Sequence, residues 1–201
     1  MIRVLIAEDQ SLVRGALRAL LDLEEDLEVV AEVGRGDAVV EAAREYRPDV
    51  ALLDIEMPGG DGIEAARALA AALPGVRAVI LTTFGRPGFL RRAMEVGAAG
   101  FLVKDAPVAE LARGIRAVMA GERVIDRDLA AAALAIGATP LSAREADVLR
   151  AAADGATVAD IAGRLFLSEG TVRNYLSSAI GKTGARTRVE AARVAAEKGW
   201  L

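Results

Sequence analysis

The first 121 residues alternate short apolar runs with longer amphipathic segments, and this alternation limits the fold more than any other feature of the chain. Short apolar runs between turn residues are typical of buried parallel strands. Because parallel strands need crossover connections, usually helices, the segments between them are expected to be helical. The predicted strands are Ile2–Ala7, Leu27–Val33, Val50–Asp54, Ala78–Leu81 and Gly100–Val103.

Helical periodicity and end signals place the segments between the strands. The first helix carries an apolar face made of Leu12, Ala16, Leu20 and Leu23. Five strand–helix units predict an α/β fold with a flavodoxin-like, doubly wound five-stranded parallel sheet in the order 2-1-3-4-5. The predicted helices are about Ser11–Leu23, Gly36–Arg47, Gly62–Leu73, Pro87–Val96 and Pro107–Met119.

Four of the predicted strands end in polar residues. Glu8 and Asp9 follow the first, Asp54 ends the third, Thr82 follows the fourth and Lys104 the fifth. Because the carboxyl ends of parallel strands meet at one edge of the sheet, these groups are expected to lie close together. For Asp54 alone, the simpler interpretation is that it begins a turn, as Asp often does. The polar residues at the ends of the other strands favour a functional site instead.

Three clustered carboxylates repel one another, and a divalent cation with oxygen ligands relieves that repulsion. Mg²⁺ suits such a set better than a softer metal. With Asp54 as nucleophile, the Lys and the hydroxyl supply partners for phosphoryl oxygens, so the groups needed for phosphoryl transfer to a carboxylate are present. The alternative is a structural ion-pair network.

The amino-acid composition excludes several kinds of chemistry. The chain has no Cys and no His, which excludes disulfides, metal sites with thiolate or imidazole ligands, and catalysis by imidazole. Transfer from a phosphohistidine therefore requires a partner protein. No run approaches the length of a membrane span, and the N-terminus leads directly into a strand, so we expect a cytoplasmic protein without membrane insertion.

Charge differs between the two parts of the chain. Residues 138–201 carry nine Lys and Arg against seven Asp and Glu, which leaves a net charge of −6 for residues 1–137 of a chain of net charge −4. An acidic first part and a mildly basic second part suggest an input module joined to a nucleic-acid reader. We expect a first domain at 1–121, a linker at 122–139 with a short helix at Asp128–Ile136, and a second domain at 140–201.

Residues 140–201 have the pattern of a small all-α, four-helix domain that begins with a capping box at Ser142 and Glu145. The second and third helices are joined by a short turn, with Ser168 as the N-cap, and share an apolar seam, which is typical of a helix-turn-helix. The seam consists of Ile161, Leu165, Val172 and Leu176. The predicted helices are Ala143–Ala153, Val158–Leu165, Glu169–Ile180 and Arg188–Lys198.

Positive charge is concentrated after the turn of this pair. No acid occurs from Gly170 to Val189, whereas four basic residues do, so this part would present positive charge to a phosphate backbone. The basic residues are Arg173, Lys182, Arg186 and Arg188. The alternative is a helical hairpin with a solvated charged face.

The first domain resembles the receiver domain of two-component response regulators. The resemblance is carried by Glu8-Asp9, Asp54, Met57-Pro58, Asp61-Gly62, Thr82, Phe101 and Lys104, with matching intervals. It implies that Asp54 accepts a phosphoryl group from a sensor histidine kinase. It further implies that Asp9, Asp54 and the backbone carbonyl of Glu56 hold Mg²⁺, with Glu8 acting through water. Lys104, Thr82 and Phe101 would be the family's lysine, switch hydroxyl and switch aromatic.

Two residues depart from the receiver pattern. Glu8 stands where Asp is commoner, and Asp105 follows Lys104 where many members have Pro. Neither change removes a required group.

The second domain resembles the LuxR-type DNA-binding domain. The matching residues are Leu141-Ser142-x-Arg144-Glu145-x-x-Val148-Leu149, Ile161-Ala162-x-x-Leu165-x-Leu167-Ser168-x-x-Thr171-Val172, Ile180-x-Lys182 and Arg188. The resemblance implies that Arg173, Asn174 and Ser177 face bases. It also implies that phosphates are held by Ser168, Thr171, Lys182 and Arg188. Tyr175 departs from the family's common His, and Ser177 often has a basic counterpart.

Together the two domains resemble the NarL/FixJ class of response regulators over essentially the whole chain. The class implies a transcription regulator, not an enzyme, that forms a homodimer on phosphorylation and binds double-stranded promoter DNA, with RNA polymerase as a further partner. Residues 81–88 and 166–175 look most like the branch whose known member controls a lipid desaturase gene after membrane cooling.

Three other classes compete with this interpretation. A haloacid-dehalogenase-type phosphatase needs a second Asp where Glu56 stands, and a flavodoxin-like FMN protein needs a phosphate loop rich in Ser, Thr and Gly after the first strand. A DNA-binding regulator whose receiver senses a ligand without phosphorylation is the stronger alternative. The joint presence of Asp9, Asp54, Thr82 and Lys104 argues against it.

Overall fold

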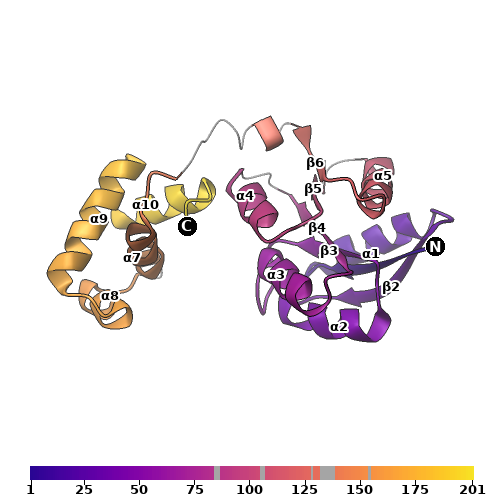
Figure 1. Cartoon of the computed structure of the whole chain (residues 1–201), viewed down its shortest axis with the longest axis horizontal. Coiled ribbons are helices and arrows are strands. Elements are labelled where there is room, and N and C mark those ends of the chain that lie inside the picture. The colour runs from indigo at the N-terminus through magenta and orange to yellow at the C-terminus, as the bar shows by residue number, and fades with distance from the viewer. Residues whose placement is uncertain (84–86, 105–106, 128, 132–138, 154) are drawn as a thin grey trace. The chain divides into compact units, whose positions relative to one another are not determined.

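The computed structural model describes residues 1–83, 87–104, 107–127, 129–131, 139–153 and 155–201. Contacts divide it into two compact units, one formed by most of the residues up to Ala130 and the other chiefly by Ala131–Leu201. Figure 1 gives the order of the elements along the chain. No helix in these described ranges is long and apolar enough to cross a membrane.

The first unit is built on a parallel sheet in the order β2-β1-β3-β4-β5-β6, so the predicted α/β architecture and strand order are confirmed. A short sixth strand, β6, pairs with β5 inside the segment predicted as linker. This strand has only two residues, too few to give a recognisable pattern in the sequence. The strands are β1 (Ile2–Ala7), β2 (Leu27–Val33), β3 (Val50–Asp54), β4 (Arg77–Thr82), β5 (Gly100–Val103) and β6 (Val124–Ile125).

Helices cover both faces of this sheet, with α1 and α5 on one face and α2 and α3 on the other (Figure 1). A 3-10 turn, η1 (Gly36–Ala38), precedes α2, where the sequence pattern predicted a single helix from Gly36. The helices are α1 (Ser11–Leu21), α2 (Val39–Tyr46), α3 (Gly62–Ala72), α4 (Pro87–Glu95) and α5 (Val108–Met119).

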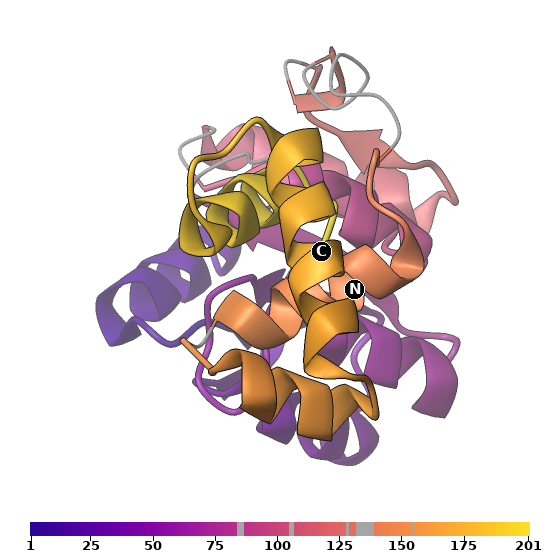
Figure 2. The ribbon, with the colours of Figure 1, turned by 90° about the vertical axis from the view of Figure 1, so that its left-hand side faces the viewer.

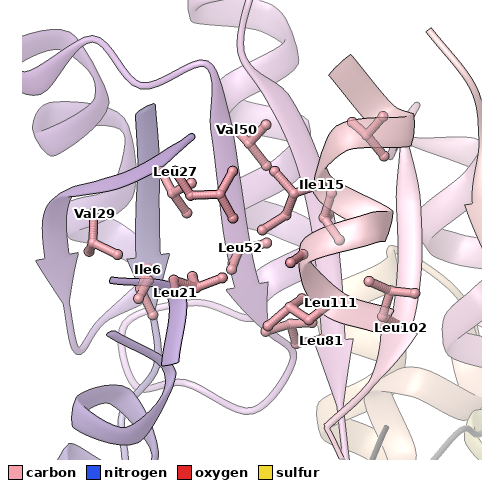
Figure 3. Packing of buried hydrophobic residues seen from close by; sticks show 14 residues of the cluster. Ile6, Leu21, Leu27, Val29, Val50, Leu52, Leu81, Leu102, Leu111 and Ile115 are labelled. Atoms are coloured by element: carbon pink, nitrogen blue, oxygen red, sulfur yellow. The ribbon is translucent and has the colours of Figure 1, made fainter. Parts of the chain in front are cut away.

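One face of the sheet packs against α1 and α5 through a continuous apolar core (Figure 3). Ile6 and Leu52 from neighbouring strands, and Ile115 from α5, are fully buried there. Each such side chain contributes roughly 1.5–3 kcal/mol relative to an exposed one. This core fixes the positions of the strands, and therefore of the residues that follow their carboxyl ends.

The first helix is rotated relative to its predicted apolar face. Leu12 and Leu23 are 85% and 77% exposed, and Ala16 is also exposed. Leu21 is instead fully buried, and Leu17 packs beside it. Apolar residues occur on more than one side of this helix, so periodicity alone did not select the face that packs on the sheet.

Between residues 139 and 201, the described part of the second unit contains four helices that pack around a separate core. The described helices are α7 (Ala143–Ala153), α8 (Val158–Leu165), α9 (Glu169–Thr183) and α10 (Arg188–Glu197). Helix α9, which faces the viewer in Figure 2, contacts the other three. It runs to Thr183, beyond the predicted end at Ile180, because Gly184 adopts the left-handed conformation that ends the helix.

Two stretches singled out in the sequence extend outside the described residues. The predicted linker helix, Asp128–Ile136, falls mostly on residue 128 and residues 132–136, which the structure does not describe. Within the stretch 81–88, residues 84–86 are likewise not described.

Candidate functional site

The carboxyl edge of the sheet gathers three carboxylates. Glu8 follows β1 and is 1% exposed, Asp54 ends β3 and is 5% exposed, and Asp9 is exposed beside them. One oxygen from each lies within 4.8 Å of the others. The strand register explains this proximity, because Ala7 pairs with Leu53, one residue before Glu8 and Asp54 respectively.

Lys104 follows β5 and places its ammonium group between the two buried carboxylates. Its Nζ lies 2.5 Å from Glu8 Oε2 and 2.9 Å from Asp54 Oδ1, and its side chain is 8% exposed. The backbone N–H of Lys104 donates to the carbonyl of Thr82 at 2.8 Å, which ties the ends of β4 and β5 together. Strands far apart in the sequence thus build one compact charged site.

Burial and pairing act in opposite directions on these three groups. Burial raises the pKa of Asp54 and of Glu8, and pairing with Lys104 offsets it only in part. Burial lowers the pKa of Lys104, but its interactions with Glu8 and Asp54 outweigh burial, so this pKa is raised. The ammonium therefore stays charged at neutral pH, while the carboxyls lie in a site that disfavours their negative charge.

Thr82 and Phe101 occupy the last two strands beside this site. Thr82 ends β4, is buried, and pairs in register with Val103, the residue before Lys104. Phe101 is fully buried within β5, opposite Ile80.

The charge balance and the donor atoms at this edge fit a hard divalent cation. Three carboxylates and one ammonium leave two uncompensated negative charges when all are ionised. Among the residues that the structure describes, none makes a regular hydrogen bond to the buried Glu8 Oε2, although Lys104 Nζ is near. Oxygen ligands with this net charge are those that Mg²⁺ prefers. Glu56 is exposed in the loop that follows Asp54.

That loop, between β3 and α3, is held by close backbone contacts. The N–H of Gly62 donates to the carbonyl of Ile55, and the N–H of Gly36 donates to the carbonyl of Pro58. A Cβ on Gly62 would lie 2.0 Å from the carbonyl oxygen of Asp54, so only glycine fits there. The backbone around Asp54 is therefore positioned by its neighbours on both sides.

In the second unit, α8 and α9 form the predicted helix-turn-helix. Ser168 caps α9, because its Oγ accepts from the N–H of Thr171 at 3.1 Å. The predicted seam is present, with Ile161, Val172 and Leu176 buried and Leu165 packed beside them.

The side chains predicted to read DNA lie on the outer side of α9 and near its ends. Arg173, Asn174, Ser177 and Ser168 are exposed, while Thr171 and Arg188 are half-buried. Arg173 forms an exposed ion pair with Glu169 at 2.5 Å. Lys182 is also exposed at the surface, but its Nζ lies 2.7 Å from the buried Glu145.

Comparison with known proteins decides the family. A model of the response regulator receiver domain matches residues 4–116, and one of bacterial regulatory proteins of the luxR family matches residues 139–195. The chain belongs to the response regulators. This response regulator is 45% identical to the transcriptional regulatory protein DesR of Bacillus subtilis (strain 168) over 201 residues, which cover 100% of both chains.

Solved structures agree with this assignment. The response regulator resembles ChrA from a heme-sensing two-component system, with 35% identity, a TM-score of 0.60, and coverage of 100% of this chain and 98% of ChrA. It also resembles RcsB of Salmonella enterica serovar Typhimurium bound to a promoter with the phosphomimetic BeF₃⁻, with 25% identity, a TM-score of 0.73 and 98% coverage of each chain. The predicted NarL/FixJ class is confirmed, and its members are transcription regulators, not enzymes.

Two contacts in this response regulator were not foreseen from its sequence. Arg14 on α1 donates to the backbone carbonyl of Glu8 at 2.5 Å, which holds the loop that carries Glu8 and Asp9. Arg92 on α4 pairs with Asp61, the N-cap of α3, at 3.0 Å. Neither had a signal in the sequence, because an Arg on a helix is ordinary and its partner is set by the tertiary fold.

Proposed function

We propose that this response regulator accepts a phosphoryl group on Asp54 from a sensor histidine kinase, then dimerises and binds promoter DNA to control transcription. The observation that carries the proposal is the position of Asp54. Its carboxylate ends a central strand, lies 2.9 Å from Lys104 Nζ, and has Glu8 and Asp9 beside it. A nucleophile, a cation and metal-binding oxygens therefore meet at one point.

In the proposed transfer, a carboxylate oxygen of Asp54 attacks the phosphorus of a phosphohistidine. The new O–P bond forms as the N–P bond breaks, and the imidazole nitrogen leaves with the electron pair and takes a proton. The histidine comes from a partner protein, because this chain has none. Lys104 and the hydroxyl of Thr82 are the proposed partners of the transferred phosphoryl oxygens, and Thr82 and Phe101 the proposed switch residues.

Mg²⁺ is the proposed cofactor. Asp9, Asp54 and the backbone carbonyl of Glu56 would hold it, with Glu8 acting through water. When bound, the ion supplies positive charge against the oxygens of the transferring phosphoryl group. The support from this chain is the set of three carboxylates, whose mutual repulsion a divalent cation relieves.

On the DNA side, we propose that Arg173, Asn174 and Ser177 face bases, and that Ser168, Thr171 and Arg188 contact phosphates. Exposure of the first three on α9 supports this arrangement. Lys182, predicted as a further phosphate contact, has its charge paired with Glu145 and is left out of this set. RNA polymerase at the promoter is a proposed partner, and the cytoplasm the proposed location.

We propose that each predicted domain has its own function. Residues 1–121 would be phosphorylated, residues 140–201 would bind DNA, and residues 122–139 would link the two. The receiver and luxR-family matches fall within the first and, but for one residue, the last of these ranges.

Intact-mass measurement after incubation with acetyl phosphate tests the assignment of Asp54. The protein should gain one phosphoryl group with Mg²⁺ present and none in excess chelator. Asp54→Asn should gain none, whereas Asp147→Asn, which changes an exposed carboxylate of the second unit, should behave as the wild type. Modification of Asp54→Asn to the wild-type extent would contradict the assignment.

A further inference from the structure

A buried carboxylate in the second unit joins two helices through a set of short contacts. Glu145, in the first turn of α7, is 5% exposed. It accepts from the N–H of Ser142 at 2.6 Å, from the hydroxyl of Ser178 at 2.6 Å and from Lys182 Nζ at 2.7 Å. Two of its three partners belong to α9. The capping box of α7 therefore also anchors the helix proposed to read DNA.

Ser178 and Lys182 lie one turn apart on a flank of α9, between its buried side and its outer side. The buried side is formed by Val172, Leu176 and Ala179, with Tyr175 and Ile180 packed beside them. Apolar contacts are non-directional, so they define the rotation of a helix about its axis less sharply than hydrogen bonds do. Directional bonds on the flank, made to a fixed charge, resist such rotation.

Lys182 is constrained by the same contacts. If its ammonium group moved away from Glu145 to reach a DNA phosphate, it would leave a buried carboxylate without a charge partner, which is strongly unfavourable. Burial raises the pKa of Glu145, but hydrogen bonds from Lys182, Ser178 and Ser142 outweigh burial and hold it at about 2, so this carboxylate is charged at neutral pH. The exchange of partners on DNA binding is therefore disfavoured.

We propose that Glu145 is a positioning residue for sequence readout, which fixes the rotation of α9 through Ser178 and Lys182. Lys182 acts through Glu145 and not as a phosphate contact. This inference rests on the proposed DNA-binding function. According to this inference, Glu145 controls how Arg173, Asn174 and Ser177 face the bases, although it is buried on α7 and remote from the outer side of α9.

The first test measures affinity of the full-length protein for a selected site and a scrambled site at three salt concentrations. Glu145→Gln should lower the ratio of the two affinities about tenfold, roughly the effect of one mismatched base pair, with little change on scrambled DNA. Lys182→Met should lower the same ratio and leave the salt dependence unchanged. Arg188→Met should instead reduce the salt slope by about one.

Arg193→Met is the matched control, since Arg193 carries an exposed ion pair with Glu197 on α10 and has no part in these contacts. It should change neither the ratio nor the slope. An unchanged ratio in Glu145→Gln, or a salt slope reduced by about one in Lys182→Met, would overturn the inference.

The second test needs no DNA. Hydrogen–deuterium exchange of the full-length protein should be faster across Glu169–Thr183 in Lys182→Met, and adding Glu145→Gln should slow it again, because the second change removes the unpaired buried charge. Exchange that is unaffected by Lys182→Met, or faster still in the double variant, would contradict the coupling. If the wild-type protein binds the selected and the scrambled site equally well, the proposed sequence-specific function is wrong. The exchange result alone would then test whether Glu145 holds α9 in place.

Discussion

At the scale of single residues, the site at the sheet edge is defined by charges that are held together against their repulsion. Glu8 and Asp54 are both buried and share one ammonium group from Lys104. Asp9 adds a third carboxylate without burial. The protein thus keeps a local excess of negative charge, and a cation should stabilise the folded receiver.

Mg²⁺ should therefore raise the free energy of unfolding of the receiver by about 1.4 kcal/mol at ten times its dissociation constant. Asp9→Asn removes one proposed ligand and should abolish most of this gain. Calorimetry with and without Mg²⁺ measures it, with the exposed Asp22→Asn as control. An equal gain in Asp9→Asn and in the wild type would exclude Asp9 as a ligand.

The lowered pKa of Glu145 predicts how the free energy of unfolding of the second unit changes at acid pH. Its pKa is about 2 against an ordinary 4.5, so its contribution is fully present above pH 4.5 and is lost as the pH falls from 4.5 through 2. The shift corresponds to roughly 2–3 kcal/mol after allowance for the solvent exposure of Lys182. Urea unfolding followed by fluorescence of Trp200, the single Trp, which packs in this core, reports on it.

The difference in unfolding free energy between wild type and Glu145→Gln should shrink across that pH range. Asp147→Asn, whose carboxylate pairs with Arg150 in solvent, should show a nearly constant difference. A wild-type advantage that persists at pH 2 would show that the carboxylate charge of Glu145 is not the source of its effect.

The receiver residues were predictable because they follow strand ends, where the fold leaves few alternatives. Glu8, Asp9, Asp54 and Lys104 meet as the polar exits of the strands indicated. The pairing of Lys182 with Glu145 was not predictable, since residues 37 positions apart meet only through the packing of α7 against α9. The spacing of residues in the sequence shows which chemical groups are present. It does not show whether a flexible Lys pairs with a carboxylate of the protein or with a DNA phosphate.

At the scale of elements, the loop that follows β3 depends on the close approach of two glycines. A Cβ on Gly36 would lie 2.1 Å from the carbonyl oxygen of Gly60. Gly36 is buried, and its N–H donates to the carbonyl of Pro58 at 3.0 Å. The turn before α2 therefore supports the loop that carries Glu56.

Gly36→Ala should accordingly lower the free energy of unfolding of the receiver by roughly 1–3 kcal/mol, since backbone must shift to admit the methyl group. Gly15→Ala is the matched control, because nothing lies within 4 Å of a Cβ there, in the middle of α1. It should raise stability by roughly 0.5–1 kcal/mol. Calorimetric melting of both variants compares them, and a loss of similar size in each would show that the contact with Gly60 is unimportant.

Element positions could be predicted wherever apolar runs were bounded by strong turn residues. The helix orientation could not, because α1 has apolar residues on several sides and only packing against β1, β2 and α5 selects Leu21 over Leu12. Strand β6 has two residues, too few for a periodicity, and exists because β5 offers it an open edge. Contacts with other elements therefore determine both the buried face of α1 and the formation of β6.

At the scale of the whole molecule, a receiver domain and a luxR-family domain occupy one chain. A single α9 with one Arg near its start would make few base contacts, and helix-turn-helix proteins typically gain affinity by pairing on half-sites about 10 bp apart. We therefore expect phosphorylation to increase the dimer fraction measured by light scattering. A fully phosphorylated protein with unchanged mass and shape would exclude this route.

Within such a dimer, base and phosphate contacts should separate by their effects on different sequences. Arg173→Ala should relax discrimination at particular base pairs, because its guanidinium is exposed on the outer side of α9. Arg188→Ala should weaken binding to all sequences alike. A gel-shift series on selected and scrambled sites compares them, and equal loss on both sites for Arg173→Ala would mean that this side of α9 does not face the bases.

DNA affinity measured in one sample before and after phosphorylation, with the extent of modification followed by intact mass, tests most directly whether Asp54 controls DNA binding. We expect phosphorylation of Asp54 to tighten binding to the selected site by about tenfold or more, which corresponds to at least about 1.4 kcal/mol of coupling. Asp54→Asn, treated identically, should show no change. Unchanged affinity in fully phosphorylated protein, or an equal response in Asp54→Asn, would contradict it.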